Sequence, residues 1–470
     1  ATMLPVLYHN PSQEPLSWNR LNKYNINNTY PSKQLEGETI FDFFKKAPFS
    51  LRNNIPIQTF QKIVNRKTED FVGREYIFDE IDRYVNDDEQ FKSGYIVVLG
   101  EPGIGKSAMM AQLVKQKEFV HHFNTENVYS TEQFWANICS QLILKYGLEY
   151  SDLPSPERDS PESNFQEEQK QEQKRNMNNE NQRIKKYRMF FEEELISQIT
   201  EKEKTVIILI DALDEAEEKL IQDRSNLLFL PKSLPDGIFF LITARPDKNY
   251  SLFVDNRRNI EMDDRDPRNI NDVRRYVQEF LNKYREQMLS QIEKWGINDE
   301  EFIETITQKS DGNFMYSMNI LMDIRDKHLN PQNIDDINNL PQGLESYYRQ
   351  HWGYMKSKYE ERFDKIDNKI IRLLSVVKEP VPVSDLTRWM NIQKHEVKEH
   401  EVKEIISIWC RFLNETQSEK GDDLYRIYHS SYHDFLQQTV GFDEVQLMIK
   451  RSIFSRIRIK TKDLKMKKKL

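Results

Sequence analysis

The residues best suited to chemistry begin with the run GEPGIGKS, Gly100 to Ser107, which fits the pattern G-x-x-x-x-G-K-[ST]. Gly100, Gly103 and Gly105 would let backbone N–H groups converge on phosphate oxygens at the start of a helix, whose dipole also favours anions. Lys106 would then meet the β- and γ-phosphates, and Ser107 would bind Mg²⁺. The pattern predicts a phosphate-binding loop (P-loop) for a nucleotide, and the apolar run before it disfavours a chance glycine-rich turn.

Carboxylates end a second apolar run, VIILIDALDEAEE. An aliphatic strand that ends in Asp211 would bring a carboxylate to the sheet edge beside the P-loop, where Mg²⁺ needs a ligand. Asp214 and Glu215 follow and would polarise an attacking water, although carboxylates here also suit a solvated helix start. Arg245 ends another apolar run, FFLITARPD, where its guanidinium would sense the γ-phosphate or form a surface ion pair.

The elements that must position these residues alternate from Tyr95 to about Asp264. The apolar runs YIVVL, EFVHHF, TVIILID, GIFFLITA and NIEM are separated by amphipathic segments, which is typical of a parallel sheet with helices on both faces. A helix is expected before the first strand, at GREYIFDEIDRYV. Residues 151–185 contain almost no apolar side chains, which predicts a disordered insertion.

Helical periodicity dominates beyond residue 267. The segments RNINDVRRYVQEFLNKY, EEFIETITQKSDGNFMYSMNILMDIRD and LESYYRQHWGYM predict an α-helical domain. A third block follows, with helices expected at NKIIRLLSVVKEPVPVSDLTRWMNI and VKEIISIWCRFLNETQ, and a strand leading to a helix at DLYRIYHSSYHDFLQQ. Helices followed by a short β-wing favour a winged helix.

The expected fold is an α/β P-loop NTPase with an AAA+-like parallel sheet, followed by an α-helical domain and a winged-helix domain. A chain of 470 residues is long enough to bury several cores. The expected parts are a linker or N-terminal extension at 1–65, the P-loop nucleotide-binding domain at 66–266, the helical domain at 267–345, the winged-helix domain at 346–440 and a basic C-terminal tail at 441–470.

Composition narrows the partners and the compartment. The formal net charge of -8 does not by itself point to nucleic acid or to a membrane. Cys139 and Cys410 are the only cysteines, which excludes a disulfide framework and a cysteine metal cluster and fits a reducing cytosol. No apolar run approaches the roughly 18 to 20 residues that span a bilayer, and the start lacks a signal-peptide layout, so we expect a cytoplasmic protein without a membrane partner.

The histidine pairs do not suggest a metal site. His395 and His400 lie among glutamates, but a spacing of five does not place them on one helical face, which favours a solvated helix. His121 and His122 are adjacent on an expected strand and would point to opposite sides, so their spacing does not make them a catalytic pair.

Taken in order, FVGRE, GEPGIGKS, LIDALDE, ITARP, SDGNFMYSMNIL and YHSSYHDFL resemble the motifs of STAND NTPases. The resemblance covers about residues 65–440 and is strongest to the bacterial NACHT-type proteins, relatives of the apoptotic and NLR immune switches. DALDE and YHSSYHDFL discriminate best, because a P-loop is shared by many unrelated ATPases.

Several binding roles are implied by this resemblance. Val72, Gly73 and Arg74 match the motif that brackets the adenine and ribose, where the alternative is an ordinary helix entry. His429 matches a winged-helix histidine that bonds the β-phosphate of ADP, and His433 is the rival. For either histidine the alternative is a side chain satisfied within a packed interface.

One stretch departs from the family pattern. Many STAND proteins have Gly-x-Pro in the helical domain, with the proline near the adenine, whereas this chain has Gly312, Asn313 and Phe314. Phe314 would stack on the base or pack in the core of an amphipathic helix, and core packing is favoured.

The resemblance implies a slow, switch-type ATPase with ATP or ADP and Mg²⁺ as cofactors. ADP would be clamped between Lys106 and Ser107 on one side and His429 on the other. Exchange for ATP would release the winged helix and let protomers self-associate into a ring or filament, in bacterial stress or antiphage defence signalling. Effector and sensor modules are not evident in this chain, which fits a fragment, a minimal form, or a subunit whose partners supply both.

Two alternatives of different class remain. A scaffold that binds nucleotide without turnover is disfavoured because Asp211, Asp214 and Glu215 are all present. A winged-helix regulator that acts on DNA would use the basic tail RSIFSRIRIKTKDLKMKKKL, but the glutamates of HEVKEHEVKEII would repel a polyanion.

Overall fold

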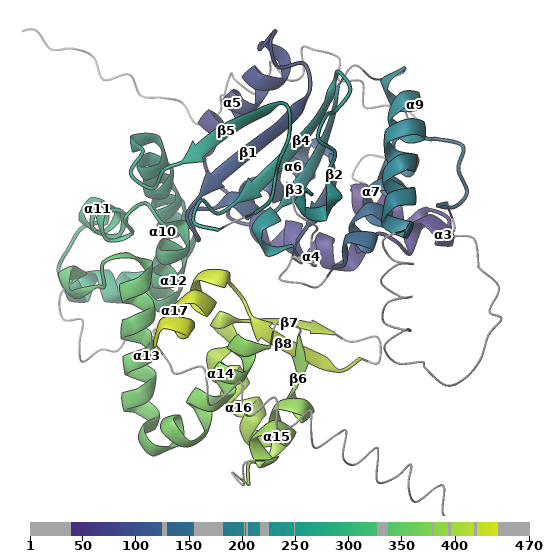
Figure 1. Cartoon of the computed structure of the whole chain (residues 1–470). Coiled ribbons are helices and arrows are strands. Elements are labelled where there is room, and N and C mark those ends of the chain that lie inside the picture. The colour runs from purple at the N-terminus through teal and green to yellow at the C-terminus, as the bar shows by residue number, and fades with distance from the viewer. Residues whose placement is uncertain are drawn as a thin grey trace, which may run out of the picture. The chain divides into compact units, whose positions relative to one another are not determined.

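The computed structural model describes most of the chain between residues 39 and 439, and these residues form two compact units (Figure 1). The first unit holds the described residues of 1–100, 106–125 and 129–262, and the second those of 101–105 and 263–470. The expected basic tail and most of the expected insertion at 151–185 lie outside the described residues. The described ranges are 39–124, 129–154, 182–201, 203, 205–216, 225–248, 250–326, 337–377, 380–392, 396–417 and 421–439.

A five-stranded sheet of order β2-β3-β4-β1-β5 forms the centre of the first unit, and all of its strand pairs are parallel (Figure 1). Every apolar run expected to be a strand is one, which confirms the predicted parallel sheet. The central strands are buried on both faces, and this explains why they read as continuous apolar runs. The strands are β1 (Gly94–Gly100), β2 (Val120–Phe123), β3 (Val206–Asp211), β4 (Ile238–Ala244) and β5 (Arg257–Met262).

Helices cover both faces of this sheet. On one face, Trp135 and Phe191 pack in a core that contains Tyr95 and Phe240, whose rings stack at 5.3 Å. On the other face, an apolar pocket is lined by side chains of two helices together with Ile207 and Leu241. The first face is covered by α7 (Thr131–Tyr146), the π-helical turn η1 (Phe190–Leu195) and α9 (Ile196–Thr200), and the second by α5 (Glu75–Asn86) and α6 (Lys106–Lys117).

Residues 39–65 are not a linker, which corrects the interpretation of the first 65 residues for the part that the structure describes. Phe44 and Phe60 are completely buried, and the Phe60 ring lies 5.4 Å from that of Phe123 on the sheet. These residues are too few to form a core alone, but they complete the core of the sheet. The helices are α2 (Ile40–Lys46), α3 (Phe49–Arg52) and α4 (Ile57–Thr68).

The second unit begins with helices whose ends follow local sequence signals. Asp266 accepts a hydrogen bond from the Arg268 N–H at 2.8 Å and caps the first of them, which ends at Gly296 in the left-handed region. Asn298 opens the next helix by a capping box with Glu301. The elements are α10 (Pro267–Trp295), α11 (Asp299–Lys309), α12 (Phe314–Arg325), η4 (Ile337–Asn339) and α13 (Gly343–Arg362).

Short helices and an antiparallel sheet of order β6-β8-β7 complete the second unit (Figure 1). The expected strand and helix near the end are present, but the helix expected through LNETQ ends at Trp409. Leu413–Gln417 instead form β7, because pairing with β8 overrides the helical pattern. The elements are η5 (Phe363–Asp367), α14 (Asn368–Val376), β6 (Val381–Pro382), α15 (Val383–Ile392), α16 (Glu399–Trp409), η6 (Cys410–Phe412), β7 (Leu413–Gln417), β8 (Asp423–Ile427) and α17 (Ser430–Thr439).

Among the described residues, no helix combines the length and the apolar character that crossing a membrane requires.

Candidate nucleotide-binding site

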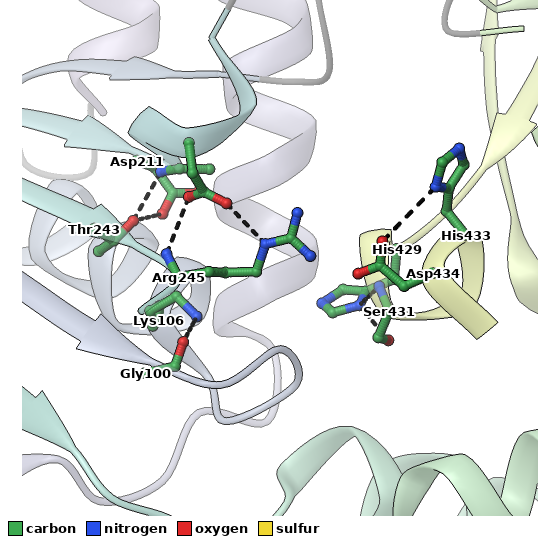
Figure 2. A network of polar contacts seen from close by, with 11 residues as sticks. Gly100, Lys106, Asp211, Thr243, Arg245, His429, Ser431, His433 and Asp434 are labelled. Carbon is green, nitrogen blue, oxygen red and sulfur yellow. Dashed lines mark hydrogen bonds and ion pairs between the residues drawn. The ribbon is translucent and has the colours of Figure 1, made fainter. Parts of the chain in front are cut away.

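The P-loop joins the end of β1 to the start of α6, as its pattern predicts. Gly103 and Gly105 have φ values of +86° and +108°, which a side chain would strain. Lys106 Nζ donates a hydrogen bond to the Gly100 carbonyl at 2.5 Å (Figure 2). The ammonium group is therefore held over the loop whose backbone would receive the phosphates.

Within the second unit, residues 101–105 of the P-loop are bonded to the start of α12. The Met315 N–H donates to the Gly103 carbonyl at 3.1 Å, and Asn313 Nδ2 donates to the Pro102 carbonyl at 2.9 Å. A Cβ atom on Gly103 would lie 2.6 Å from Asn313 Oδ1. Gly103 is thus required both by its backbone conformation and by the close approach of Asn313.

The contact of Asn313 with the P-loop was not predicted from the sequence, where Asn313 is the middle residue in place of Gly-x-Pro. Its Oδ1 also accepts from the Tyr316 N–H at 3.1 Å and caps α12. An asparagine before an apolar helix is an N-cap signal, which would have placed this side chain at the helix start. The neighbouring Phe314 is half-buried, and its ring centre lies 5.7 Å from that of Tyr276.

Asp211 and Ser107, the two expected Mg²⁺ ligands, are brought together. Asp211 ends β3, and its buried carboxylate accepts from Thr243 Oγ1 at 2.6 Å (Figure 2). A hydrogen bond with the Ser107 side chain also stabilises this carboxylate. Burial raises the pKa of Asp211, and these hydrogen bonds and the charges of Lys67 and Lys106 oppose that rise.

This pair of oxygen ligands fits Mg²⁺, which is commonly bound by one or two protein oxygens together with water and substrate phosphates. A bound cation would also offset the burial of the Asp211 carboxylate. The described residues contain no group of three histidines, cysteines or acidic residues that could hold a metal ion by themselves. The donor set therefore suits a metal shared with a nucleotide rather than a closed structural site.

Thr243 and Asn124 support Asp211 and were not predicted. Thr243 Oγ1 also accepts from the Ala212 N–H at 2.8 Å, so a single hydroxyl fixes the side chain of Asp211 and the backbone after it. Asn124, directly after β2, donates from Nδ2 to the Asp211 carbonyl at 3.0 Å. The available signal was a polar residue at the end of an apolar strand run, which is the edge where parallel sheets gather their sites.

Arg245 and Asp214 form a buried ion pair. Arg245 Nε donates to Asp214 Oδ2 at 2.8 Å, and the Arg245 N–H donates to Oδ1 at 3.2 Å (Figure 2). Only 9% of the arginine side chain and 2% of the aspartate side chain are exposed. The sequence allowed Arg245 an ion pair on the surface, whereas the ion pair observed here is buried. Asp214 accepts these hydrogen bonds with both of its carboxylate oxygens. Glu215 is the next residue of the same turn, η2 (Leu213–Glu215).

Val72, Gly73 and Arg74 form a strained turn before α5. Gly73 and Arg74 have φ values of +79° and +73°, and the left-handed region is unusual for an arginine. The Arg74 side chain is almost completely buried, and its Nη1 donates to the Tyr76 hydroxyl at 3.0 Å. The chain therefore enters α5 through two left-handed residues, a conformation that is strained for an arginine.

His429 lies just before α17, where its own segment holds the ring. Its Nδ1 lies 2.7 Å from Ser431 Oγ and accepts from the Ser431 N–H at 3.2 Å (Figure 2). The rival His433 faces residues of its own helix, with Asp434 Oδ1 at 4.0 Å and Gln437 Nε2 at 3.3 Å. The two histidines thus have different surroundings, and Ser431 is a partner that the sequence did not single out.

The other histidines do not form a site. His121 and His122 are buried in β2, where His121 Nδ1 bonds the Phe119 carbonyl at 2.8 Å and His122 Nδ1 lies 3.0 Å from Asn137 Nδ2. Burial lowers their pKa values to about 4 and about 3, so both rings are neutral at pH 7. His400 is exposed on α16, and His395 lies outside the described residues.

In a comparison with protein families, residues 70–240 match the family described as AAA ATPase domain. The matched range includes the P-loop and Asp211, which supports the binding and hydrolysis of ATP by this part of the chain. No protein of curated function matches the chain in sequence.

Comparison with solved structures also gave matches of low identity. A STAND protein with a tetratricopeptide repeat sensor from Pyrococcus horikoshii is 14% identical, with a TM-score of 0.38, over 80% of this chain and 44% of that protein. A chain of the Drosophila ORC bound to DNA is 12% identical, with a TM-score of 0.32, over 81% of this chain and 98% of that one. A RuvB mutant from Thermotoga maritima is 12% identical, with a TM-score of 0.29, over 79% and 97%. This chain thus spans less than half the length of the Pyrococcus protein.

Proposed function

We propose that this chain is the core of a STAND-class signalling ATPase of the bacterial NACHT type, which holds ADP at rest and hydrolyses ATP slowly. The observation that carries the proposal is the meeting of Ser107 with Asp211 at the P-loop, inside the range that matches an AAA ATPase domain. A serine and an aspartate bonded to each other at the ends of neighbouring elements are the expected ligands of Mg²⁺ beside the phosphates.

In this proposal each residue has a defined task. Lys106 binds the β- and γ-phosphates, and Ser107 and Asp211 hold Mg²⁺, which supplies positive charge to the phosphate oxygens. Glu215 polarises the attacking water, because both oxygens of Asp214 accept hydrogen bonds from Arg245.

Arg245 binds the γ-phosphate with its guanidinium while Asp214 keeps the hydrogen bonds from the Arg245 Nε and N–H. The buried Asp214 carboxylate is then not left without its cation. Val72, Gly73 and Arg74 flank the adenine and ribose, where the strained turn holds the backbone in one conformation.

We assign the second unit a helical domain at 267–345 and a winged-helix domain at 346–440, after a nucleotide-binding domain at 66–266. The order of α14, β6, α15, α16, β7 and β8, with an antiparallel sheet, supports the winged helix. His429 bonds the β-phosphate of ADP and stabilises the resting state.

Activation follows from a difference in nucleotide affinity between two states, which is the only way a ligand can shift such an equilibrium. ATP would favour the state without the His429 contact, and protomers would then self-associate into a ring or filament. We place this switch in the cytoplasm, in stress or antiphage defence signalling. Effector and sensor functions would come from other modules or subunits.

The first test identifies the nucleotide that purified protein carries. Freshly purified full chain is denatured, and the released nucleotide is identified by mass spectrometry and counted. We expect about one ADP per chain, and a large loss of it in His429→Ala. His433→Ala is the matched control and should keep the nucleotide. An empty site in folded protein would contradict the clamp.

The other outcomes separate the alternatives. One ADP per chain with no ATP turnover, even with Mg²⁺ in excess, would favour the nucleotide-binding scaffold. Salt-dependent binding to duplex DNA with an empty nucleotide site would favour a DNA regulator. Glu399 and Glu401 in the first turn of α16 oppose that reading, because they would face DNA phosphates with like charge.

A further inference from the structure

We propose that Ser431 and Tyr348 are positioning residues that aim His429 and couple it to the P-loop through Met315. The inference rests on the proposed function, because it concerns the histidine that would bond ADP. Gly103, Met315, Tyr348, His429 and Ser431 all belong to the second unit, and the contacts between them are direct.

The backbone N–H of residue 431 determines which nitrogen of His429 carries the proton, and the Ser431 hydroxyl holds the ring in place. The Ser431 N–H points at Nδ1 from 3.2 Å, and a donor in that place requires Nδ1 to be the acceptor. The proton of the neutral ring then lies on Nε2, which becomes a donor. A phosphate oxygen accepts hydrogen bonds, so this is the tautomer that the proposed clamp needs.

Tyr348 holds Ser431 in turn. The Tyr348 hydroxyl lies 2.9 Å from Ser431 Oγ, which is 2.7 Å from His429 Nδ1. The Tyr348 side chain is only 2% exposed, and its ring contacts those of Tyr432 and Phe412 at 5.0 and 5.9 Å. Because packed aromatic rings leave little freedom, the hydroxyl of Tyr348 is a fixed reference for Ser431.

Met315 connects this pair to the P-loop. The Tyr348 hydroxyl lies 3.3 Å from Met315 Sδ, and the Met315 N–H donates to the Gly103 carbonyl at 3.1 Å. One residue at the start of α12 therefore touches the phosphate-binding loop with its backbone and the histidine network with its side chain. A change in the loop on nucleotide exchange would displace Met315. Through Tyr348 and Ser431, this displacement would change the orientation of the His429 ring.

The test removes single hydroxyl groups and measures ADP release. Ser431→Ala and Tyr348→Phe each delete one oxygen of the network and keep the apolar packing. Tyr432→Phe is the matched control, because the Tyr432 hydroxyl is buried without a hydrogen-bond partner among the described residues. Ser431→Thr keeps the hydroxyl and should rescue the loss.

Full-length protein is loaded with a fluorescent ADP analogue, and its release is followed after a chase with excess ATP. We expect Ser431→Ala and Tyr348→Phe to accelerate ADP release about five- to tenfold, because each variant loses one of the hydrogen bonds that orient the His429 ring. Tyr432→Phe and Ser431→Thr should stay within about twofold of the parent protein.

The same substitutions on a His429→Ala background separate positioning from general loosening. If Ser431 and Tyr348 act through His429, they should have no further effect once the ring is absent. A fast release in the single variants that persists on this background would overturn the inference and leave the clamp intact. Parent-like release in His429→Ala itself would overturn both the clamp and the inference.

Discussion

Single hydroxyl and carboxylate groups, rather than clusters of charge, hold the candidate metal site together. Thr243 donates to Asp211 Oδ1 at 2.6 Å and accepts from the Ala212 N–H at 2.8 Å, while Ser107 bonds the same carboxylate. Ala212 itself has a φ of +52°, so the turn after β3 needs this support. The site is therefore sensitive to changes that leave its shape unaltered and remove one hydrogen bond.

Thr243→Val tests this sensitivity. Valine has nearly the same shape, but it leaves the buried Asp211 carboxylate and the Ala212 N–H without the threonine hydroxyl, at a cost of about 1 to 3 kcal/mol. We expect a higher Mg²⁺ concentration for half-maximal ATP turnover and a lower unfolding temperature, measured by steady-state hydrolysis and by calorimetry. Thr243→Ser keeps the hydroxyl and should behave much like the parent protein; equal losses in both variants would contradict the assignment.

The junction between α11 and α12 depends on one glycine. Gly312 has a φ of +75°, and a Cβ atom there would lie 1.9 Å from the Asp264 carbonyl. The buried Asn269 fills the remaining space and donates from Nδ2 to the carbonyls of Asp264 and Gly312 at 3.0 and 2.9 Å. The start of α12, which carries Asn313 to the P-loop backbone, is positioned by this close approach.

Gly312→Ala should therefore lower stability by about 3 kcal/mol or more, because the clash adds to the strain of a left-handed alanine. Gly296→Ala is the matched control, since Gly296 has a φ of +67° but no atom within 4 Å of its added Cβ. The control should lose only about 1 kcal/mol. Urea denaturation of both variants measures the difference, and similar losses would show that the tight contact does not matter.

The strand β2 makes the first unit sensitive to acid. Its two histidines have pKa values of about 4 and about 3 in the folded chain, chiefly because burial disfavours the charged ring. The unfolded chain, with pKa values near 6.5, binds more protons as the pH falls. Stability is thus complete above about pH 6.5 and is lost progressively toward pH 4 and pH 3.

Between pH 7 and pH 5 the two rings together should lower the free energy of unfolding by about 4 kcal/mol, measured by urea denaturation at each pH. His122→Phe is expected to remove about half of this slope. His400→Gln changes an exposed histidine on α16 and serves as the control, which should keep the full slope. A slope in His122→Phe equal to that of the parent would refute the assignment.

At the scale of the whole molecule, the second unit is joined by an ion pair between elements far apart in sequence. Arg411 in η6 pairs with Asp323 in α12 and, at 3.7 Å, with Asp326. Asp323 also accepts from the Tyr347 hydroxyl at 2.9 Å, and its side chain is only 7% exposed. This carboxylate links α12, α13 and the segment that leads into β7.

Arg411→Gln should destabilise the second unit by about 3 kcal/mol, because it leaves a buried carboxylate without its cation. Arg349→Gln breaks the exposed pair with Glu345, whose side chains are 69% and 64% exposed, and should lose less than about 0.5 kcal/mol. Hydrogen exchange of the backbone over 399–439 measures the loosening. Equal protection in the two variants would argue against a joining role for Arg411.

The sequence by itself determined the elements and the ends of strands. The runs from YIVVL to NIEM predicted each strand of the parallel sheet, and the signal is strongest for β1, β3 and β4, because strands buried on both faces are continuously apolar. GEPGIGKS predicted the P-loop, since the conformations of the glycines and the position of the lysine depend on the local sequence alone. The edge that holds Asp211 followed from the parallel sheet, because carboxyl ends of parallel strands share one edge.

Only the tertiary structure decided which side chains meet. The pairing of Arg245 with Asp214, the hydroxyl of Thr243 on Asp211 and the contact of Asn313 with Pro102 join residues far apart in sequence. The helices of residues 39–65 were misjudged for the same reason, since their few phenylalanines become a core only against the sheet. The periodicity of apolar residues indicates which face of one element is buried. A site and a shared core depend instead on distances between elements, and no local pattern contains those distances.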